Sequence, residues 1–542
     1  MESYIYRKVI TACATVIFAA GLWGCEPEPE TTSVQKEGEV TFKERYRPQF
    51  HYTPPEHWMN DPNGMFYYDG KYYLHHQYNP FGNTWGHMSW YQAVSEDLVH
   101  WEHKGVVIPE EGNEMIFSGG AIVDHDNTSG FGDEGETPIV ATYSSHYSYE
   151  GEDPDFEQAQ SLAYSLDGGE TFTKYEGNPV ITDEDPDFRD PNVKWHEESD
   201  QWIMVVALPI QRKVAFYGSE NLREWEHLSN FGPIGSTEGI WECPDFFELA
   251  VDGDPDNTRW VMHVDVSPGA VAGGSGSQYF IGDFDGTEFI LDEEATSFEI
   301  VEDAVDEEVL WTDYGTDFYA AISWSDIPEE DGRRMWLGWM SNWEYATAKP
   351  TSPWKSAQSV PRTVDLISVD DEIRMAQSPI EELQQLRQDH QQIENFEING
   401  EQISLQDQGI SGKAFEIKAE LDAGSAENFG LEVRAGDKQE TLIGYDVNSG
   451  NLYVDRTNSG DVGFSEHFPS RSEAPLDLND NTIELHILVD WSSVEVFAAD
   501  GTKVLTKRIF PHPDSRDIRL FSEGGEANVV ALDFWKLASI WD

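Results

Sequence analysis

The chain has 542 residues, of which 39% are hydrophobic and 25% charged, a composition typical of a folded globular protein and not of a disordered or fibrous one. Its 34 Lys and Arg residues stand against 102 Asp and Glu residues, so the formal net charge at pH 7 is −68. This charge argues against nucleic acid as a partner. It favours a salty habitat whose counterions screen the carboxylates, although an unusually acidic secreted protein in ordinary medium is the alternative.

Residues 1–25 predict an export signal. An apolar stretch over 9–24 follows two basic residues and is too short to span a membrane. It ends in Leu-Trp-Gly-Cys, which resembles a bacterial lipobox, so Cys25 is the predicted lipidation site, with an ordinary secretory signal as the alternative. Residues 26–44 predict an acidic, extended tether. We therefore expect an extracytoplasmic protein that contacts a membrane or cell surface only through a lipid anchor, or is secreted.

Residues 45–377 predict a β-propeller. Short apolar or aromatic runs alternate with Gly, Asn, Asp and Pro, as β-strands alternate with tight turns. A weak repeat of a polar turn followed by an aromatic residue begins at Ser95, Ser165 and Ser219, at intervals of 70 and 54 residues. Such intervals suit four-stranded blades with long loops, and roughly 60 residues per blade gives five blades.

Residues 378–542 predict a linker and a second domain. Pro379, followed by apolar residues at helical spacing, predicts a short connecting helix over 378–395. Apolar residues then alternate along 483–489, which predicts a β-strand, and a β-sandwich is the simplest fold for 396–542. The expected fold class is thus all-β, a five-bladed propeller followed by a C-terminal sandwich.

Cysteine and histidine usage predicts no cofactor and no metal. The three cysteines are Cys13, Cys25 and Cys243, and the first two fall in the export segment, which excludes a disulfide framework or a multi-cysteine metal site. The histidines at 75, 76 and 87 and the acidic loops at 124–126 and 252–256 lack the ligand spacing of zinc or calcium motifs. Solvated acidic turns are the simpler interpretation of these loops.

Three short segments place a carboxylate next to, or two residues before, a proline in an aromatic setting. Their acids are Asp61, Asp190 and Glu242, separated by 129 and 52 residues, close to two blades and one blade. Equivalent strands of different blades line the central channel of a propeller. The spacing therefore predicts that the three acids meet at one mouth of that channel.

Three acids in an aromatic funnel favour glycoside cleavage, which needs a carboxyl group on each side of the scissile bond. We expect burial beside Trp241, together with repulsion from Asp61 and Asp190, to keep Glu242 protonated near neutrality. Asp61 would then be the ionised nucleophile. Cys243, which follows the acid and has no histidine in its motif, fits a packing or weak hydrogen-bonding role better than a nucleophilic one.

The same segments resemble those of glycoside hydrolase family 32, the family of invertases, inulinases and levanases. The resemblance covers residues 45–542 and includes the tracts 77–80, 85–90, 117–119 and 490–497. It implies a five-bladed propeller that carries the active site, a following β-sandwich, and a retaining double displacement on β-fructofuranosides.

The resemblance also implies a role for each site residue. Asp61 would attack C2 of a fructosyl unit, Glu242 would act first as acid and then as base, and Asp190 would stabilise the transition state. The residues implied in substrate binding are Asn60, Gln77, Trp85, Phe117, Ser118, Arg189 and Trp339. The assignment of Trp339 stays open, because Trp336 and Trp343 are aromatic residues close to it in the sequence.

The tract 78–90 is more similar to those of microbial levanases and exo-inulinases than to those of sucrose-specific invertases. The expected function is hydrolysis of a fructan, levan or inulin, from the chain end to release fructose, with sucrose as a further substrate. A fructosyltransferase or an endo-acting levanase with the same acids is the alternative, followed by a non-catalytic fructan-binding surface protein. The sequence predicts no particular oligomeric state.

Overall fold

The structure is a computed structural model that describes residues 40–147, 157–292, 309–370 and 372–541. Residues 40–542 form one compact unit. The predicted export signal, Cys25 and residues 26–39 of the predicted tether lie outside the described residues. In the described part of the chain, no helix has the length and apolarity needed to cross a membrane.

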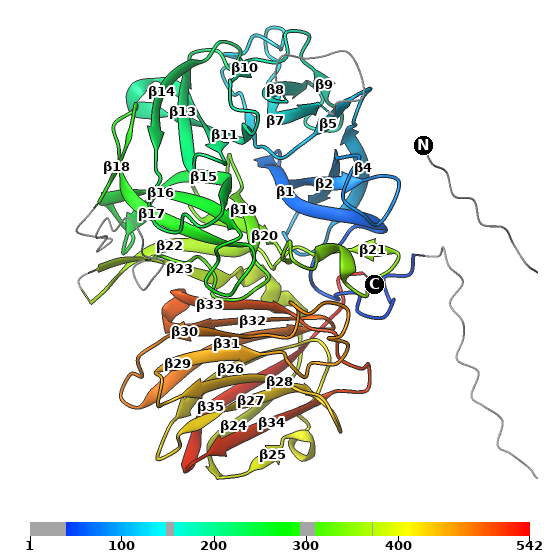
Figure 1. Ribbon diagram of the computed structural model, residues 1–542, viewed down its shortest axis with the longest axis vertical. Helices are drawn as coiled ribbons and strands as arrows, with labels where there is room; N and C mark the ends of the chain where they lie inside the picture. The colour runs from blue at the N-terminus through cyan, green and yellow to red at the C-terminus, as the bar shows by residue number, and fades with distance from the viewer. Residues whose placement is uncertain (1–39, 148–156, 293–308, 371, 542) are drawn as a thin grey trace, which may run out of the picture. The chain divides into compact units, whose positions relative to one another are not determined.

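Strands β1 to β23 form the five blades of the propeller (Figure 1). The first blade contains, in sheet order, β21 (Trp354–Lys355), β1 (His57–Tyr68), β2 (Lys71–Asn79), β3 (Ser89–Ser95) and β4 (Glu102–Ile108). The second contains β10 (Ile181–Thr182), β8 (Gln158–Ser165), β7 (Ile139–Tyr147) and β5 (Glu114–Ile116), with β6 (Ala121–Val123) on β7 and β9 (Thr173–Lys174) on β8. The third contains β11 (Arg189–His196), β12 (Gln201–Leu208), β13 (Lys213–Ser219) and β14 (Glu226–Phe231).

The fourth and fifth blades share one eight-stranded sheet. The fourth contains β18 (Phe289–Leu291), β17 (Gly276–Phe284), β16 (Asp254–Ser267) and β15 (Ile240–Val251). The fifth contains β22 (Arg362–Val369), β20 (Arg334–Trp339), β19 (Tyr319–Ser323) and β23 (Glu372–Pro379). They join through one parallel pair, Val251 with Leu366, so the sheet divides naturally into two blades.

The sequence repeat marks equivalent points of the first three blades. Each repeat begins at the last residue of β3, β8 or β13, and its serine hydroxyl donates to the side chain two residues later. The pairs are Ser95 with Asp97, Ser165 with Asp167, and Ser219 with Asn221. The same local turn therefore leads out of these three strands, and the predicted blade repeat is confirmed.

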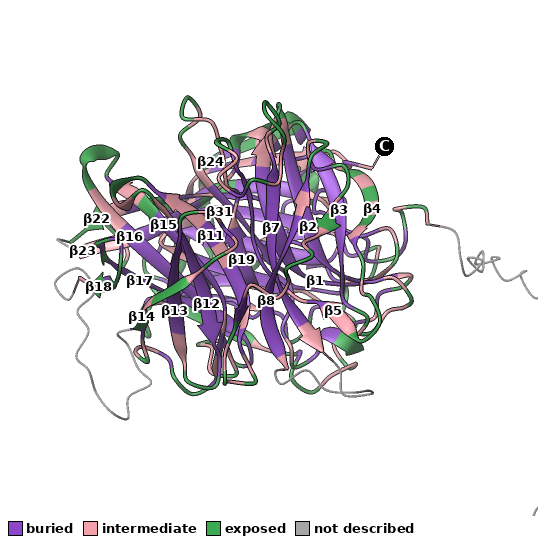
Figure 2. Ribbon diagram, turned by 90° about the horizontal axis from the view of Figure 1, so that it is seen from above, coloured by how far each residue is buried: buried purple, intermediate pink, exposed green. Residues whose placement is uncertain are grey.

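The innermost strands β1, β6, β11, β15 and β19 contact one another in a closed ring. Figure 2 shows that burial is concentrated on the strands, while exposed residues gather in the turns. The ring encloses the central channel, and the residues at one end of these strands carry the acidic motifs.

The C-terminal domain is a sandwich of two six-stranded sheets. One sheet contains β24 (Arg387–Asn399), β35 (Glu526–Leu537), β26 (Phe415–Asp422), β31 (Thr482–Asp490), β32 (Ser493–Ala498) and β33 (Lys503–Arg508). The other contains β25 (Gln402–Ser404), β34 (Asp517–Glu523), β27 (Asn428–Ala435), β28 (Thr441–Asp446), β29 (Asn451–Asp455) and β30 (Arg471–Pro475). The alternating residues Ile483, Leu485, Ile487 and Val489 are buried in the core between the sheets, as predicted.

The predicted helix over 378–395 is wrong beyond Leu386. A 3-10 helix, η3 (Glu381–Leu386), buries Leu383 and Leu386, and from Arg387 the chain continues as β24, paired antiparallel with β35. Pairing along a sheet edge therefore outweighs a local pattern that fits a helix. The other helices of the described residues are also short 3-10 segments: η1 (Glu197–Ser199), η2 (Ala346–Ala348), η4 (Gln406–Gln408) and η5 (Ala499–Gly501).

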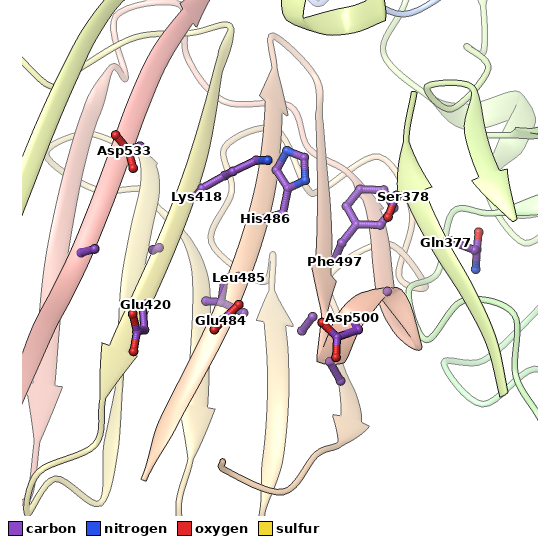
Figure 3. A pocket seen from close by; sticks show the side chains of 15 residues that line it. Gln377, Ser378, Lys418, Glu420, Glu484, Leu485, His486, Phe497, Asp500 and Asp533 are labelled. Atoms are coloured by element: carbon purple, nitrogen blue, oxygen red, sulfur yellow. The ribbon is translucent and has the colours of Figure 1, made fainter. Parts of the chain in front are cut away.

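Buried ion pairs join the propeller to the sandwich. Arg362 on β22 donates to Glu495 on β32 at 2.5 Å and to Asp313 at 3.2 Å. His51 bridges Asp490 and Glu495, each at 2.8 Å. The tract 490–497 thus fastens the two domains together. Beside this contact, Gln377 and Ser378 of the fifth blade face a polar groove on the outer side of the sandwich sheet (Figure 3).

Candidate active site

Each acidic motif lies at an irregularity of an innermost strand. The register shifts between Met59 and Pro62 on β1, between Arg189 and Asn192 on β11, and between Glu242 and Asp245 on β15. Proline has no N–H to donate to the neighbouring strand, and a bulge both tolerates it and redirects the adjacent side chain. The prolines of the three motifs therefore help to turn the carboxylates into the channel.

The three acids line a single cavity of about 280 Å³. They come from the first, third and fourth blades, and the side chains of Asp61 and Asp190 are only 8% and 6% exposed. The meeting of Asp61, Asp190 and Glu242 that the spacing predicts is confirmed. Ionised carboxyl groups that are buried in one small cavity lose hydration and repel one another. They must therefore be protonated or accept hydrogen bonds from neighbouring groups.

Asp61 is held by two hydrogen-bond donors. Ser118 Oγ donates to Oδ2 at 2.7 Å and Asn60 Nδ2 donates to Oδ1 at 3.0 Å, while Trp58 Nε1 holds Asn60 Oδ1 at 2.7 Å. Burial raises the pKa of Asp61, and the two donors oppose this rise. The neighbouring groups thus orient the carboxylate and favour its ionised form.

Asp190 lies in an environment that raises its pKa strongly. Burial raises its pKa to about 7, repulsion from Glu242 and Asp61 acts in the same direction, and Arg189 opposes the rise. The backbone N–H of Cys243 donates to Oδ2 at 3.0 Å. The Cys243 thiol lies 3.6 Å from this oxygen, and burial raises the pKa of the thiol, so Cys243 is a neutral neighbour and not a thiolate.

Glu242 has a different environment from the expected one. Trp241 points to the opposite side of β15, where it is fully buried and its indole N–H donates to the carbonyl of Ser236. Glu242 itself faces two donors: Arg189 Nη2 at 2.9 Å from Oε1, and the Tyr319 hydroxyl at 2.5 Å from Oε2. The expected burial of Glu242 beside Trp241 is therefore wrong.

A fourth carboxyl lies behind Glu242 and was missed by the sequence analysis. Asp265 is directly opposite Glu242 on β16, is fully buried, and accepts hydrogen bonds from Ser277 and from the backbone N–H of Ala320. Burial raises its pKa well above the ordinary value, which keeps Asp265 neutral. Ala320 has a φ of 54° and follows Tyr319, so Asp265 supports the strained backbone that presents Tyr319 to Glu242.

Six of the seven predicted substrate-binding residues line the cavity: Asn60, Gln77, Trp85, Phe117, Ser118 and Arg189. Gln77 is 2% exposed and its Nε2 has no hydrogen-bond partner within the described residues, so this donor is available to a ligand.

Trp339 is not part of the cavity wall. It is fully buried at the end of β20, with its ring 4.8 Å from that of Trp343. Trp343, on the loop that follows this strand, lines the cavity instead. The loop carries Trp343 past the strand end toward the mouth, whereas the strand holds Trp339 in the core.

Three further lining residues were missed: His146, Gln158 and Asp187. The ring of His146 stacks on Phe117 at 4.4 Å, and Gln158 Oε1 accepts Arg189 Nη1 at 3.3 Å. Asp187 lies 3.2 Å from the same guanidinium and could have been found from its place beside the Arg189 motif. His146 and Gln158 pair across β7 and β8 in a stretch without a recognisable motif.

The cavity is closed toward the interior of the channel. Asn192 Nδ2 donates to Asp245 Oδ1 at 2.8 Å, linking β11 to β15 below the acids. Gly120 packs against Asn192 so closely that a Cβ there would lie 2.8 Å from its Oδ1. These contacts occupy the channel directly below the acids.

The chain is similar to known proteins over most of its length. The chain is 47% identical over 505 residues to a levanase of Bacillus subtilis, covering 92% of this chain and 72% of that protein. It is 39% identical over 527 residues to an extracellular exo-inulinase of Aspergillus awamori, covering 92% and 96% of the two chains. A crystal structure of exo-inulinase from the same organism superposes with a TM-score of 0.85 at 37% identity, over 92% of this chain and all of that one.

A β-fructofuranosidase of Schwanniomyces occidentalis complexed with fructosyl-erythritol superposes with a TM-score of 0.81 at 32% identity, over 92% of this chain and 99% of that one. Residues 51–379 match the family model for the glycosyl hydrolases family 32 N-terminal domain, and residues 382–536 match that for the family 32 C-terminal region. The expected resemblance is thereby confirmed, and the chain belongs to glycosyl hydrolase family 32.

Proposed function

We propose that this glycoside hydrolase is a retaining β-fructofuranosidase that releases fructose from the ends of fructan chains. The observation that carries the proposal is the meeting of Asp61, Asp190 and Glu242 in one small cavity of a family 32 enzyme. The similarity of the chain to a levanase and to an exo-inulinase supports a fructan as the substrate.

In the proposed first step, Asp61 attacks C2 of the terminal fructosyl unit. Ser118 and Asn60 hold the attacking carboxylate in one orientation. Glu242 gives its proton to the glycosidic oxygen, so the C2–O bond breaks and the shortened chain leaves with a hydroxyl group. A fructosyl ester of Asp61 remains in the cavity.

In the second step, Glu242 takes a proton from water, and the water oxygen attacks C2 and displaces Asp61. Fructose leaves with the configuration that it had in the chain. Asp190, which accepts hydrogen bonds from ring hydroxyls in this proposal, stabilises the positive charge that develops on the sugar in both steps.

The proton on Glu242 is supplied within the cluster of acids. Because burial and the repulsion from Glu242 and Asp61 raise the pKa of Asp190 to about 7, Asp190 binds a proton in a large share of the molecules near neutrality. Ring hydroxyls that donate to Asp190 favour its ionised form and so transfer this proton to Glu242. Substrate binding itself then activates the acid.

Action at the chain end is supported by the shape of the cavity. Its volume of about 280 Å³ is small, and its base is closed by Asn192 and Asp245. Trp85, 43% exposed, lies at the mouth, where it can bind the next sugar unit of the chain. Such a cavity admits a terminal unit but no continuous chain.

The substrate proposal is tested by incubating the enzyme with levan, inulin and sucrose and separating the products by size. If the enzyme acts by exo hydrolysis, free fructose should be released from the start of the reaction. Large fragments before fructose would indicate endo cleavage, and longer oligosaccharides from concentrated sucrose would indicate transfer to sugar. Binding without turnover would contradict catalysis altogether.

We also propose lipidation of Cys25, with residues 26–39 as a tether that holds the enzyme outside the cytoplasm. The predicted tether is wrong at its end, because residues 40–44 belong to the compact unit, where Phe42 stacks on Trp541 and Glu44 is buried against Arg47. Relatives named as extracellular exo-inulinases support an external location. In a bacterial host that processes lipoproteins, the protein should partition with membranes, and Cys25→Ala should release it. A protein that is soluble with Cys25 intact would contradict the anchor.

A further inference from the structure

A second cavity, here called the lower cavity, lies further along the same innermost strands. Its volume is about 400 Å³, and it is lined by residues of β6, β11 and β20. Ile122 follows Ser118 by four residues, and Lys194 follows Asp190 by four residues. At roughly 3.3 Å per residue, the lower cavity is about 13 Å from the catalytic one. The contact between Asn192 and Asp245 lies between the two.

Two basic side chains with unused donors line this cavity: Arg334 and Lys194, whose pKa burial lowers to about 7. Lys194 Nζ makes one hydrogen bond, to the carbonyl of Phe246 at 3.0 Å. Arg334 Nη1 approaches the carbonyl of Trp324 at 3.3 Å, while its Nε has no partner within the described residues. A guanidinium has five N–H donors and an ammonium has three, so both groups can bind further oxygen atoms.

An aromatic wall lies beside these two side chains. Trp195 is partly exposed and lines the lower cavity, with its ring packed edge to face on Trp202 at 5.1 Å. Trp202 is fixed in turn by a hydrogen bond of 2.8 Å from its indole N–H to Thr128. The indole of Trp195 is thus a rigid apolar face at a polar site, the combination that orients small ligands.

Carboxylates complete the lining, and two of them are exposed. Asp126 and Glu197 are solvent-exposed, whereas Asp124 is fully buried and accepts the backbone N–H groups of Thr128 and Ser129. Asp124 therefore closes a turn and is not available to a ligand. Asp326 likewise accepts the N–H of Val123 at 2.9 Å.

The balance of these groups selects the class of ligand. Four carboxylates outnumber the three basic side chains of the lining, Lys194, Arg334 and His125, which disfavours an anion, and the described residues contain no cluster of three metal-ligating side chains. A neutral molecule rich in hydroxyl groups can accept from Lys194 and Arg334, donate to the carboxylates and place a C–H face on Trp195. Sugars have this chemistry.

We propose that the lower cavity is a second carbohydrate-binding site, which holds a sugar unit of the polymer that the enzyme degrades. The identity of that sugar as a fructan rests on the proposed function. Binding there keeps a polymer close to the enzyme after each cleavage and raises the local concentration of chain ends at the catalytic mouth.

The test counts binding sites on the inactive full-length Asp61→Asn protein by equilibrium dialysis. The probes are trisaccharides of the inulin and levan series, sucrose, maltotriose and cellotriose. We expect two sites for at least one probe, and one site when Trp195→Ala is added. Lys418→Met in the groove of Figure 3 is the control and should leave two sites.

In the active enzyme, Trp195→Ala should raise KM for levan or inulin about five- to tenfold while leaving kcat and KM for sucrose unchanged. Glu197→Gln, an exposed change at the rim, provides a second variant if Trp195→Ala fails to fold, and it should also weaken the second site. One site for every probe, or two sites that survive both substitutions, would overturn the proposal. Failure of the proposed function is a separate result, since the unmodified enzyme would then release no fructose whatever the number of sites.

Discussion

The hydroxyl of Tyr319 on the fifth blade donates a hydrogen bond of 2.5 Å to Oε2 of Glu242 on the fourth blade. Burial, followed by the charge of Glu242, raises the pKa of Tyr319 well above its ordinary value, so the hydroxyl stays protonated at any working pH. Arg189 holds the other oxygen of Glu242. The carboxyl that must both give and take a proton is therefore fixed at both oxygens by donors that do not titrate with it.

Tyr319→Phe removes one of these donors without changing the shape of the side chain. We expect kcat to fall about 10- to 100-fold with little change in KM, because the lost hydrogen bond orients Glu242 and does not bind substrate in our proposal. Tyr279→Phe is the control, since it removes another buried tyrosine hydroxyl, bonded to the N–H of Met375, away from the cavity. Equal effects of both variants would contradict a specific role for Tyr319.

Asp61→Asn keeps the hydrogen-bonding shape but removes the nucleophile. We expect kcat on sucrose to fall by about 10⁴-fold or more, with a melting temperature that does not fall, because Ser118 and Asn60 can still contact the amide. Asp254→Asn tests another aspartate followed by proline, which accepts the N–H of Asp256 at the exposed start of β16, and should keep full activity. Measurable fructose release by Asp61→Asn, beyond that of trace unmodified protein, would reject Asp61 as the nucleophile.

Asp190→Asn should inactivate the enzyme but stabilise it at alkaline pH. The folded pKa of Asp190, about 7, lies above the ordinary value, so keeping this carboxylate ionised in the folded protein costs free energy above pH 7. The cost disappears as pH falls through 7 toward 4, where both the folded and the unfolded chain bind the proton. We expect the variant to gain about 1 to 4 kcal/mol at pH 8 and almost nothing at pH 4, measured by urea unfolding. A gain that does not depend on pH would contradict this account.

The sequence predicted the parts of the site that depend on spacing. Intervals of 129 and 52 residues place Asp61, Asp190 and Glu242 on innermost strands of three different blades, and the repeat at Ser95 marks the end of a blade strand. These features follow from the periodicity of the fold. A pattern that repeats with the blade is visible in one dimension, because each blade repeats the same local geometry.

Side-chain direction and tertiary pairing were not predictable in the same way. Trp339 is the last residue of β20, whereas Trp343 lies in the loop after it. Because the strand ends between them, only the ring of Trp343 reaches the cavity. Trp241 and Glu242 are neighbours in sequence but face opposite sides of β15. Residues 387–399 form a strand because β35 is available to pair with them. Each outcome depends on a partner far away along the chain.

Arg362→Met should uncouple the propeller from the sandwich. Arg362, Glu495 and Asp313 are almost fully buried, so losing the guanidinium leaves Asp313 without its cation and Glu495 with His51 as its remaining basic partner. We expect a loss of about 3 to 5 kcal/mol in the free energy of unfolding, partly recovered by adding Glu495→Gln. Arg259→Met breaks a partly exposed pair with Asp292 and should cost less than about 1 kcal/mol. A similar loss in the free energy of unfolding for both variants would show that the buried ion pairs of Arg362 stabilise the protein no more than a partly exposed pair does.

Salt should stabilise this protein through its surplus of carboxylates. With a net charge of −68, repulsion between surface carboxylates acts over about 10 Å at 0.1 M salt but only about 3 Å at 1 M salt. We expect the melting temperature at pH 7 to rise steeply with NaCl and to level off near about 1 M, since screening saturates whereas salting-out of apolar surface continues to grow. At pH 4 many carboxylates bind a proton, so the same titration should give a much smaller rise. Two results would contradict the interpretation of the charge as an adaptation to salt. One is a melting temperature at pH 7 that does not change with NaCl, and the other is an equal rise at pH 7 and pH 4.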